Sequence, residues 1–244
     1  MFAGPTVCGV PRSASHGFLT GWYAHNGVSL GNPRLGFVCV SEDMTGEFGL
    51  CGYFYEYDED LVPEDRLRFA QGEMPPRFES NDQPIPPLSE WNNERLAKAN
   101  RNYAMEYVRN GICQLLNVLA EDQVVALTQR AARLIGLQYA QELADDLDSL
   151  VDSEAALAEF MQTLFIAMGD EVPERPMIEN GSVRFRHENL RITKGLNADE
   201  REITLKAWTE LFAGFGMAQQ NLMTVHGEIL ENGLHWEISR LHSA

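Results

Sequence analysis

The sequence lacks the features that mark membrane, secreted and disulfide-stabilised proteins. No hydrophobic stretch approaches the roughly 18 residues that cross a bilayer, and residues 1–17 contain no basic segment followed by an apolar one. The four cysteines form no C-x-x-C pair, so free thiols are expected. We therefore expect a cytoplasmic protein without a membrane span or a signal peptide.

Basic residues are scarce, with 19 Lys and Arg against 36 Asp and Glu and a formal charge of −17. Nucleic acids and anionic membranes are bound through Lys and Arg, so we exclude both as partners. A glycine-rich phosphate loop of the Walker or dinucleotide type is also missing. A small-molecule ligand is the partner that remains, and assembly into a homo-oligomer stays open.

What is present is a chain of 244 residues, 44% of them hydrophobic, which is long enough for a sizeable core. Residues 1–62 are rich in glycine and aromatics, and "RLGFVCVS" and "GLCGYFYEY" predict a β-hairpin there. Residues 63–88 form a predicted proline-rich linker, because "GEMPPRFESNDQPIPPLS" disfavours regular structure. Residues 89–244 are predicted to form the main domain.

Helices dominate the first half of that domain. We predict helices over 89–119, with Ser89 as N-cap, over 121–147 and over 154–168, and a fourth over 197–215 that begins with a capping box of Asn197 and Glu200. Apolar residues recur every three or four positions in the first three helices, which predicts three stripes packed into the core. The stripes consist of Leu96, Tyr103, Tyr107, Ile112, Leu115, Leu116 and Leu119; of Val124, Leu127, Ala131, Leu134, Ile135 and Leu143; and of Leu157, Phe160, Met161, Leu164, Phe165 and Met168.

Strands are predicted toward the C-terminus. "SVRFRHENLRIT" indicates strand, turn, strand, and "NLMTVHGEILENGLHWEISRL" indicates a hairpin whose Asn232-Gly233 pair favours a type I′ turn. That turn would pair Glu231 with Leu234 and Ile229 with Trp236, and the apolar face would cover the helices. The predicted fold class is α+β, with a helical layer packed on a small antiparallel sheet and an N-terminal β-hairpin extension.

One candidate site lies in the N-terminal hairpin. Cys51, Tyr53, Tyr55 and Tyr57 alternate along a strand and share one face. A thiol beside three phenols suits the wall of a small-molecule pocket, although tyrosines also favour strands and Cys51 could be a small core residue. As catalytic candidates we take Cys51 as nucleophile, Tyr53 as proton donor and His16 or His25 as base, with Cys39 as the competing thiol.

Two further candidate sites lie in the main domain. His226, Glu228 and His235 share one face of the closing hairpin and could bind Zn or Fe, so a divalent metal is the candidate cofactor, although a solvated face is the alternative. Near the start of the first helix, Arg95 could hold a substrate carboxylate, although capping and solvent exposure would also explain the segment. The substrate-binding candidates are Tyr55, Trp91, Arg95 and Tyr103.

The order of elements over residues 91–244 gives a resemblance. The helices "RNYAMEYVRNGICQLLNVLAEDQVVALTQRAARLIGLQYAQEL", "FMQTLFIAMGDEV" and "AWTELFAGFGM", with the closing hairpin "HGEILENGLHWEISR", resemble the L-2-amino-thiazoline-4-carboxylic acid hydrolase-like family. The general plan also resembles the small-molecule-binding domains named after vinyl reductase. The resemblance implies hydrolysis of a C–N or C–S bond in a carboxylated small molecule, and it carries over no catalytic motif.

Two functional readings therefore remain open. In the first, the protein is a hydrolase-like enzyme in which Cys51 or a bound metal supplies the nucleophile and Arg95 anchors the substrate. In the second, it is a non-catalytic small-molecule-binding or accessory protein of the vinyl-reductase-domain type. We favour the enzyme.

Overall fold

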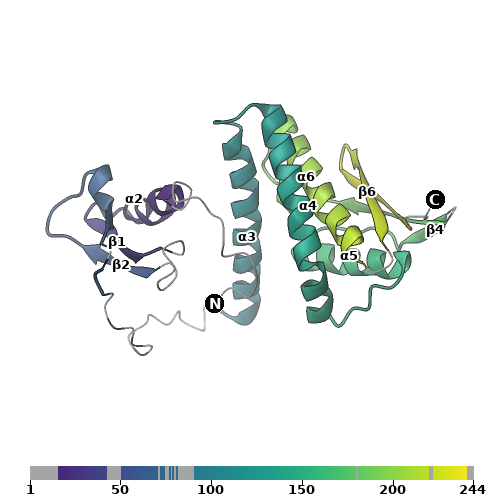
Figure 1. Cartoon of the computed structure of the whole chain (residues 1–244), viewed down its shortest axis with the longest axis horizontal. Helices are drawn as coiled ribbons and strands as arrows, with labels where there is room; N and C mark the ends of the chain where they lie inside the picture. Colours follow the sequence, from purple (N-terminus) through teal and green to yellow (C-terminus); the bar gives the residue numbers. More distant parts are fainter. Residues whose placement is uncertain are drawn as a thin grey trace. The chain divides into compact units, whose positions relative to one another are not determined.

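The computed structural model of the chain describes residues 16–42, 51–70, 72–74, 77, 79, 81, 91–179, 181–219 and 222–240. The chain divides into two compact units, residues 1–85 and 86–244, and each is described by itself. The boundary between them falls inside the linker predicted over residues 63–88. Figure 1 shows the elements of both units along the chain.

The first unit contains a three-stranded sheet in the order β2-β1-β3. Strands β1 (Leu35–Ser41) and β2 (Cys51–Glu56) form the predicted antiparallel hairpin. The sequence did not predict β3 (Leu67–Phe69), which follows a short helix (Pro63–Arg66) and pairs with β1 in parallel. Residues 63–69 of the predicted linker therefore belong to this sheet. Helical turns at Leu19–Tyr23 and α2 (Asn26–Ser29) complete the described part of the unit.

The second unit contains the helices α3 (Asn93–Leu115), α4 (Glu121–Asp146), α5 (Glu154–Met168) and α6 (Ala198–Ala218). The predicted bounds of α5 are confirmed, those of α4 agree within one residue, and the capping box of Asn197 and Glu200 begins α6. Ser89 lies outside the described residues. The observed N-cap of α3 is Asn92, whose side-chain Oδ1 accepts a hydrogen bond from the Arg95 amide at 2.9 Å. No helix built from the described residues is long and apolar enough to span a bilayer.

The sheet of the second unit has four antiparallel strands in the order β4-β5-β7-β6. They are β4 (Met177–Glu179), β5 (Ser182–Glu188), β6 (Met223–Leu230) and β7 (Gly233–Arg240). Helix α5 packs on β5 and β7, α6 packs on β6, and α4 packs against α6 (Figure 1). The α+β class, with helices layered on a small antiparallel sheet, is therefore confirmed.

The main core lies between this sheet and helices α5 and α6. Trp236 is fully buried, and the centroid of its ring lies 5.4 Å from that of Phe212 and 5.8 Å from that of Phe165. Val225 and Ile238 are buried beside it. The prediction that the apolar face of the closing hairpin covers the helices is confirmed, as is the α5 stripe, of which only Met168 is partly exposed.

The α4 stripe was predicted wrongly, because α4 approaches α6 through its small residues. A Cβ added at Gly136 would lie 2.0 Å from the Leu211 carbonyl oxygen, and a Cβ at Gly214 would lie 2.3 Å from the Arg133 carbonyl oxygen. So close a crossing needs small side chains at the contact. The residues that α4 buries are Val124, Thr128, Gly136, Ala140 and Ala144, whereas Leu127, Leu134 and Ile135 of the predicted stripe are about half exposed.

The α3 stripe was also predicted wrongly. Helix α3 has no buried residue, and Leu96, Tyr103 and Tyr107 of the predicted stripe are 36%, 57% and 44% exposed. Apart from Met105, which packs against the main core, the helix turns polar side chains toward the rest of the unit. Arg101 donates from Nη1 to the Ala167 carbonyl oxygen at 3.1 Å, and Arg109 donates to the Arg191 carbonyl oxygen at 3.3 Å.

The closing hairpin has a different turn from the one predicted. Leu230 pairs with Gly233 and Ile229 with Leu234, so Glu231 and Asn232 form the loop, and neither Asn232 nor Gly233 has the positive φ of a type I′ turn. Gly233 is required by β5 instead, since a Cβ there would lie 2.0 Å from the His187 carbonyl oxygen. The register is shifted by two residues, which leaves each side chain on its predicted face.

The second strand predicted within "SVRFRHENLRIT" is replaced by a short helix (Arg191–Thr193). Asn189 leaves β5 with a φ of 51°, a left-handed conformation that Asn tolerates. The backbone N–H of Arg191 then donates to a side-chain oxygen of Asp170 at 2.8 Å. This turn ends the strand and directs residues 191–194 back toward α3.

Candidate functional site

Cys51 and Tyr53 lie on one face of the N-terminal sheet. Both pack against Val38, Val40 and Ala70. This arrangement agrees with the predicted alternation along β2, and Cys51 is partly exposed.

His16 lies on the opposite face of the same sheet. Its ring stacks on Phe69 with centroids 4.2 Å apart, and Phe69 pairs with Cys39 across the β1–β3 ladder. Paired residues share a face, and Cys39 packs with Leu19 and Phe37 there. The sheet therefore separates His16 from Cys51, and the predicted pair is not formed. His25, the other candidate base, is the exposed residue that precedes α2.

The partner of His16 is Glu42, which the sequence analysis missed. His16 Nε2 lies 2.6 Å from Glu42 Oε1, and the Glu42 side chain is almost completely buried. Cys39 on the same face donates from Sγ to the Ser41 carbonyl oxygen at 3.3 Å. Burial, and next the charge of Glu42, raise the pKa of the Cys39 thiol, which therefore stays protonated and is a poor nucleophile.

Tyr53 of β2 and Tyr57, directly after this strand, lie beside an ion pair between Arg68 and Glu73, whose charged atoms are 2.8 Å apart. Tyr53 hydrogen-bonds with Glu73 and Tyr57 with Arg68. Tyr55 is 52% exposed, and its ring lies edge-on to that of Tyr57. The hydrogen bond from Arg68 is the main reason that the pKa of Glu73 is lowered. Two of the three phenols are thus engaged with charged groups, and a pocket on this face stays a prediction.

The predicted substrate-binding residues of α3 are only partly brought together. Arg95 lies over the ring of Trp91, with the guanidinium carbon 4.4 Å from the ring centroid. Tyr103 projects from the helix two turns further on and is mostly exposed. The amide of Arg95 is already used by the Asn92 cap, which is the alternative that the sequence left open for this segment.

The predicted metal ligands do not form a ligand set. Glu228 is opposite His235, with 3.9 Å between Oε2 and Nδ1, and His226 is opposite Glu237. Successive side chains on one face of a strand are about 7 Å apart, which is too wide for a common ion. Within the parts of the chain that the structure describes, no group of three or more His, Cys, Asp or Glu side chains could hold a metal.

A buried histidine of β5 is a feature that the sequence did not indicate. His187 Nε2 lies 2.8 Å from Asp170 Oδ2, and both side chains are completely buried. Trp236 Nε1 donates to His187 Nδ1 at 3.4 Å, so Nδ1 is the acceptor in this arrangement and Nε2 is the nitrogen that donates to Asp170. Phe165 stacks on the imidazole at 3.8 Å. No ligand reaches this pair, and its effect is to hold Asp170 where it binds the Arg191 amide.

Arg191 is held from three directions. Its NH2 group donates to Asn102 Oδ1 at 2.6 Å, its amide donates to Asp170, and its carbonyl oxygen accepts from Arg109. Gly169, with a φ of 85°, lies directly beneath it. A Cβ at Gly169 would be 3.1 Å from Arg191 Cδ and 3.5 Å from Arg101 Cζ. The absence of a side chain at Gly169 therefore lets two guanidinium-bearing side chains lie against the same backbone position.

A cavity of about 460 Å³ opens beside Gly169. Arg201, at the start of α6, donates from NH2 to the Leu230 carbonyl oxygen at 3.0 Å and so lies at its wall. The cationic lining side chains outnumber the single carboxylate, that of Glu231. The complete lining is Gly169, Asn189, Leu190, Arg191, Thr193, Lys194, Arg201, Glu231 and Asn232.

The cations of this cavity differ from most other arginines in their ion pairing. No carboxylate of a described residue lies within salt-bridge distance of Arg191, Lys194 or Arg201. The same holds for the neighbouring Arg101. Positive charges gathered without a counter-ion repel one another, and a bound anion would relieve that repulsion. Elsewhere, ion pairs join Arg34 to Glu56, Arg68 to Glu73, Arg133 to Glu210, Arg184 to Glu237, Arg186 to Glu188 and Arg240 to Glu154.

Comparisons with family models, curated proteins and solved structures find no match to this chain. The resemblance noted in the sequence therefore stays an expectation, and the site rests on its own geometry. A sequence signal for it does exist, because Arg191, Lys194 and Arg201 lie within eleven positions of a chain that is poor in bases.

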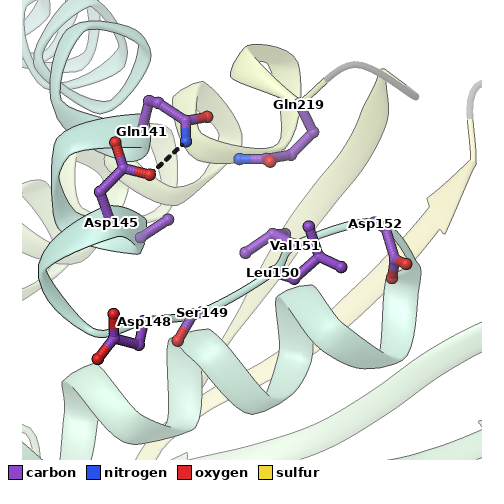
Figure 2. Close-up of a pocket in the computed structure, with 9 residues that line it drawn as sticks. Gln141, Asp145, Asp148, Ser149, Leu150, Val151, Asp152 and Gln219 are labelled. Carbon is purple, nitrogen blue, oxygen red and sulfur yellow. Dashed lines mark hydrogen bonds between the residues drawn. The ribbon is translucent and has the colours of Figure 1, made fainter.

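The second unit has a cavity of the opposite character, about 590 Å³ in volume, where α4 ends (Figure 2). Asp145, Asp148 and Asp152 line it, with Gln219 across from them. Gln141 Nε2 donates to Asp145 Oδ1 at 2.7 Å, the hydrogen bond drawn in Figure 2. A group of exposed carboxylates is not by itself evidence of a ligand, so we do not assign one to this cavity.

Proposed function

We propose that the protein binds a small molecule bearing a carboxylate in the cavity beside Gly169, and that it does so without catalysing a reaction. The observation that carries the proposal is a group of three cationic lining side chains, Arg191, Lys194 and Arg201, with Arg101 beside them. None of the four has a carboxylate partner among the described residues of this strongly acidic chain. A cavity of about 460 Å³ lies within the usual size range of small-molecule sites.

The arrangement suits a carboxylate for geometric reasons. A guanidinium presents parallel N–H groups that match the two oxygens of a carboxylate. The hydrogen bonds of Arg191 to Asn102 and of Arg201 to Leu230 fix one end of each guanidinium and leave other N–H groups free to bind. Fixing the donors in advance lowers the entropy lost on binding. Lys194, which is exposed, adds a point charge at the mouth.

The non-catalytic interpretation is supported because two thiols and a buried histidine are poorly suited to react with a ligand. Burial is the main cause that raises the pKa of both Cys39 and Cys113, which makes these thiols weak nucleophiles. The His187–Asp170 pair has no access to a ligand.

A hydrolase of the first unit is the second candidate function, and one observation favours it. The His16 imidazole lies 2.6 Å from the buried Glu42 carboxylate and is itself one-third exposed. A carboxylate that orients an imidazole is the usual support of a general base. In this candidate His16 would activate water to cleave a C–N or C–S bond. Loss of such turnover in a His16→Gln variant, with carboxylate binding unchanged, would favour the enzyme.

The proposal is tested by calorimetric titration of the full chain with acetate, succinate and phthalate, each compared with its neutral amide. We expect at least one carboxylate to bind and its amide not to bind. Lys194→Gln and Arg201→Gln should each weaken binding about tenfold or more, because a hydrogen bond to a charged group contributes about 1.5–3 kcal/mol. Arg130→Gln on α4 is the matched control, since it removes the same charge from an exposed position elsewhere.

Three results would count against the proposal. The amides could bind as well as the acids, the cavity variants could behave like Arg130→Gln, or none of the carboxylates could bind. Inorganic phosphate is titrated in parallel, and preferential phosphate binding would replace the carboxylate by a phosphate group as the recognised chemistry.

A further inference from the structure

An apolar groove of about 410 Å³ runs between α4 and α5, with α6 as its floor. Apart from one phenol and two carboxylates, its lining consists of hydrocarbon and thioether side chains. The complete lining is Ile135, Tyr139, Glu142, Leu143, Asp146, Leu164, Met168, Leu211, Phe212 and Phe215.

The groove follows from the way in which α4 packs. Because α4 meets α6 through Gly136 and other small residues, its larger side chains lie outside that contact. Ile135 and Leu143 therefore stand beside the floor residues Phe212 and Phe215, which belong to the main core. A ligand in the groove would cover apolar surface of Ile135, Leu143 and Met168 that the chain itself leaves accessible, above the buried rings of Phe212 and Phe215.

The two charged residues that line the groove are both acidic. Glu142 and Asp146 are one turn apart on α4, both are exposed, and neither forms an ion pair with a described residue. Residues 134–174, which include most of the groove, contain ten Asp and Glu and no Lys, Arg or His. The resulting potential attracts a cation and repels an anionic amphiphile of the same shape.

We infer that this groove binds a small amphipathic cation, an organic amine or quaternary ammonium with an apolar body. The apolar body would lie on Ile135, Leu143 and Met168, and the cationic group would lie between Glu142 and Asp146. The ring of Tyr139 offers an additional cation–π contact at the mouth. This site is separate from the carboxylate cavity beside Gly169, with which it shares no lining residue.

The test is a calorimetric titration of the full chain with n-alkylammonium ions from two to eight carbons. Affinity should rise about three- to fourfold for each added methylene until the groove is full, and then level off. Alkyl sulfates of equal length should bind at least tenfold more weakly, because they bring a negative charge to the same place. Neutral alcohols should fall between the two series.

Two double variants distinguish binding in the groove from a non-specific attraction of cations to the net negative charge of the chain. Glu142→Gln with Asp146→Asn should weaken alkylammonium binding about tenfold and leave alcohol binding within about twofold. Asp145→Asn with Asp148→Asn removes the same charge from the acidic cavity of Figure 2, and it should change alkylammonium affinity less than about twofold. Met168→Trp should fill the groove and abolish the dependence on chain length.

The inference is overturned if sulfates bind as tightly as ammonium ions, if affinity does not depend on chain length, or if both double variants weaken binding equally. The charge variants concern exposed side chains, so the test does not depend on the folding of Met168→Trp. Carboxylate titrations with the same double variants should match the wild type, which keeps this outcome distinct from that of the proposed function.

Discussion

Replacing Gly136 by alanine should destabilise the second unit, although the same change elsewhere in a helix is favourable. The new Cβ would lie 2.0 Å from the Leu211 carbonyl oxygen, which belongs to the backbone of α6 and cannot rotate away. The two helices must separate, and overpacking of this kind costs about 1–3 kcal/mol. Alanine recovers up to about 1 kcal/mol through its higher helix propensity. With the full propensity gain subtracted, the free energy of unfolding should still fall, by up to about 2 kcal/mol.

Gly111→Ala in α3 is the matched control, because a Cβ at Gly111 would meet no atom within 4 Å. At Gly111 only the higher helix propensity of alanine acts, so the free energy of unfolding should rise by about 0.8–1 kcal/mol. Urea unfolding followed by circular dichroism measures both changes, which should move the midpoint in opposite directions. If Gly136→Ala stabilises the protein as Gly111→Ala does, α4 and α6 do not cross at Gly136 and Gly214.

Two further predictions concern single side chains. Trp236→Ala should lower the free energy of unfolding by about 3–5 kcal/mol, because it empties a fully buried site among Phe165 and Phe212; a urea midpoint close to that of the wild type would contradict the packing. Cys39 should resist iodoacetamide at pH 8 until the protein is unfolded, since burial first and Glu42 second raise the pKa of its thiol. Mass spectrometry assigns the labelled position, and labelling of Cys39 at the rate found in denaturant would contradict its placement.

Elements with strong local signals were predicted well from the sequence. Helix α5 has an apolar stripe and a glycine directly after it, and its bounds are those observed. The capping box of α6 works in the same way, because Asn197 and Glu200 satisfy each other's backbone groups within four residues. Such signals depend on neighbours along the chain, which the sequence shows directly.

The wrong predictions are those in which the position of a residue depends on a helix or strand from elsewhere in the chain. A stripe on α4 shows which face is apolar, but the close contact at Gly136 decides which face is buried. The predicted pairing of Cys51 with His16 failed because His16 stacks on Phe69 of β3, a strand that was not predicted, on the face opposite to that of Cys51. The ladder with β5, absent from any local pattern, likewise placed Gly233 in a strand.

The contacts that hold the candidate site in place could not be predicted for a related reason. Arg191 and Asn102 are 89 positions apart in the chain, and His187 and Asp170 are 17 apart, so no short motif contains either pair. Buried polar groups need partners, but the sequence does not say which residues supply them.

The exposed edge of strand β4 affects whether the protein aggregates at high concentration. It is an outer strand of the second sheet, with Met177 and Ile178 exposed, and open strand edges of this kind invite addition of strands from other molecules. Its length limits the risk, because Pro176 directly before it cannot donate to a ladder and the chain turns at Gly181, whose φ is 80°. An incoming strand would find only three residues to pair with, too short a template for a growing fibril.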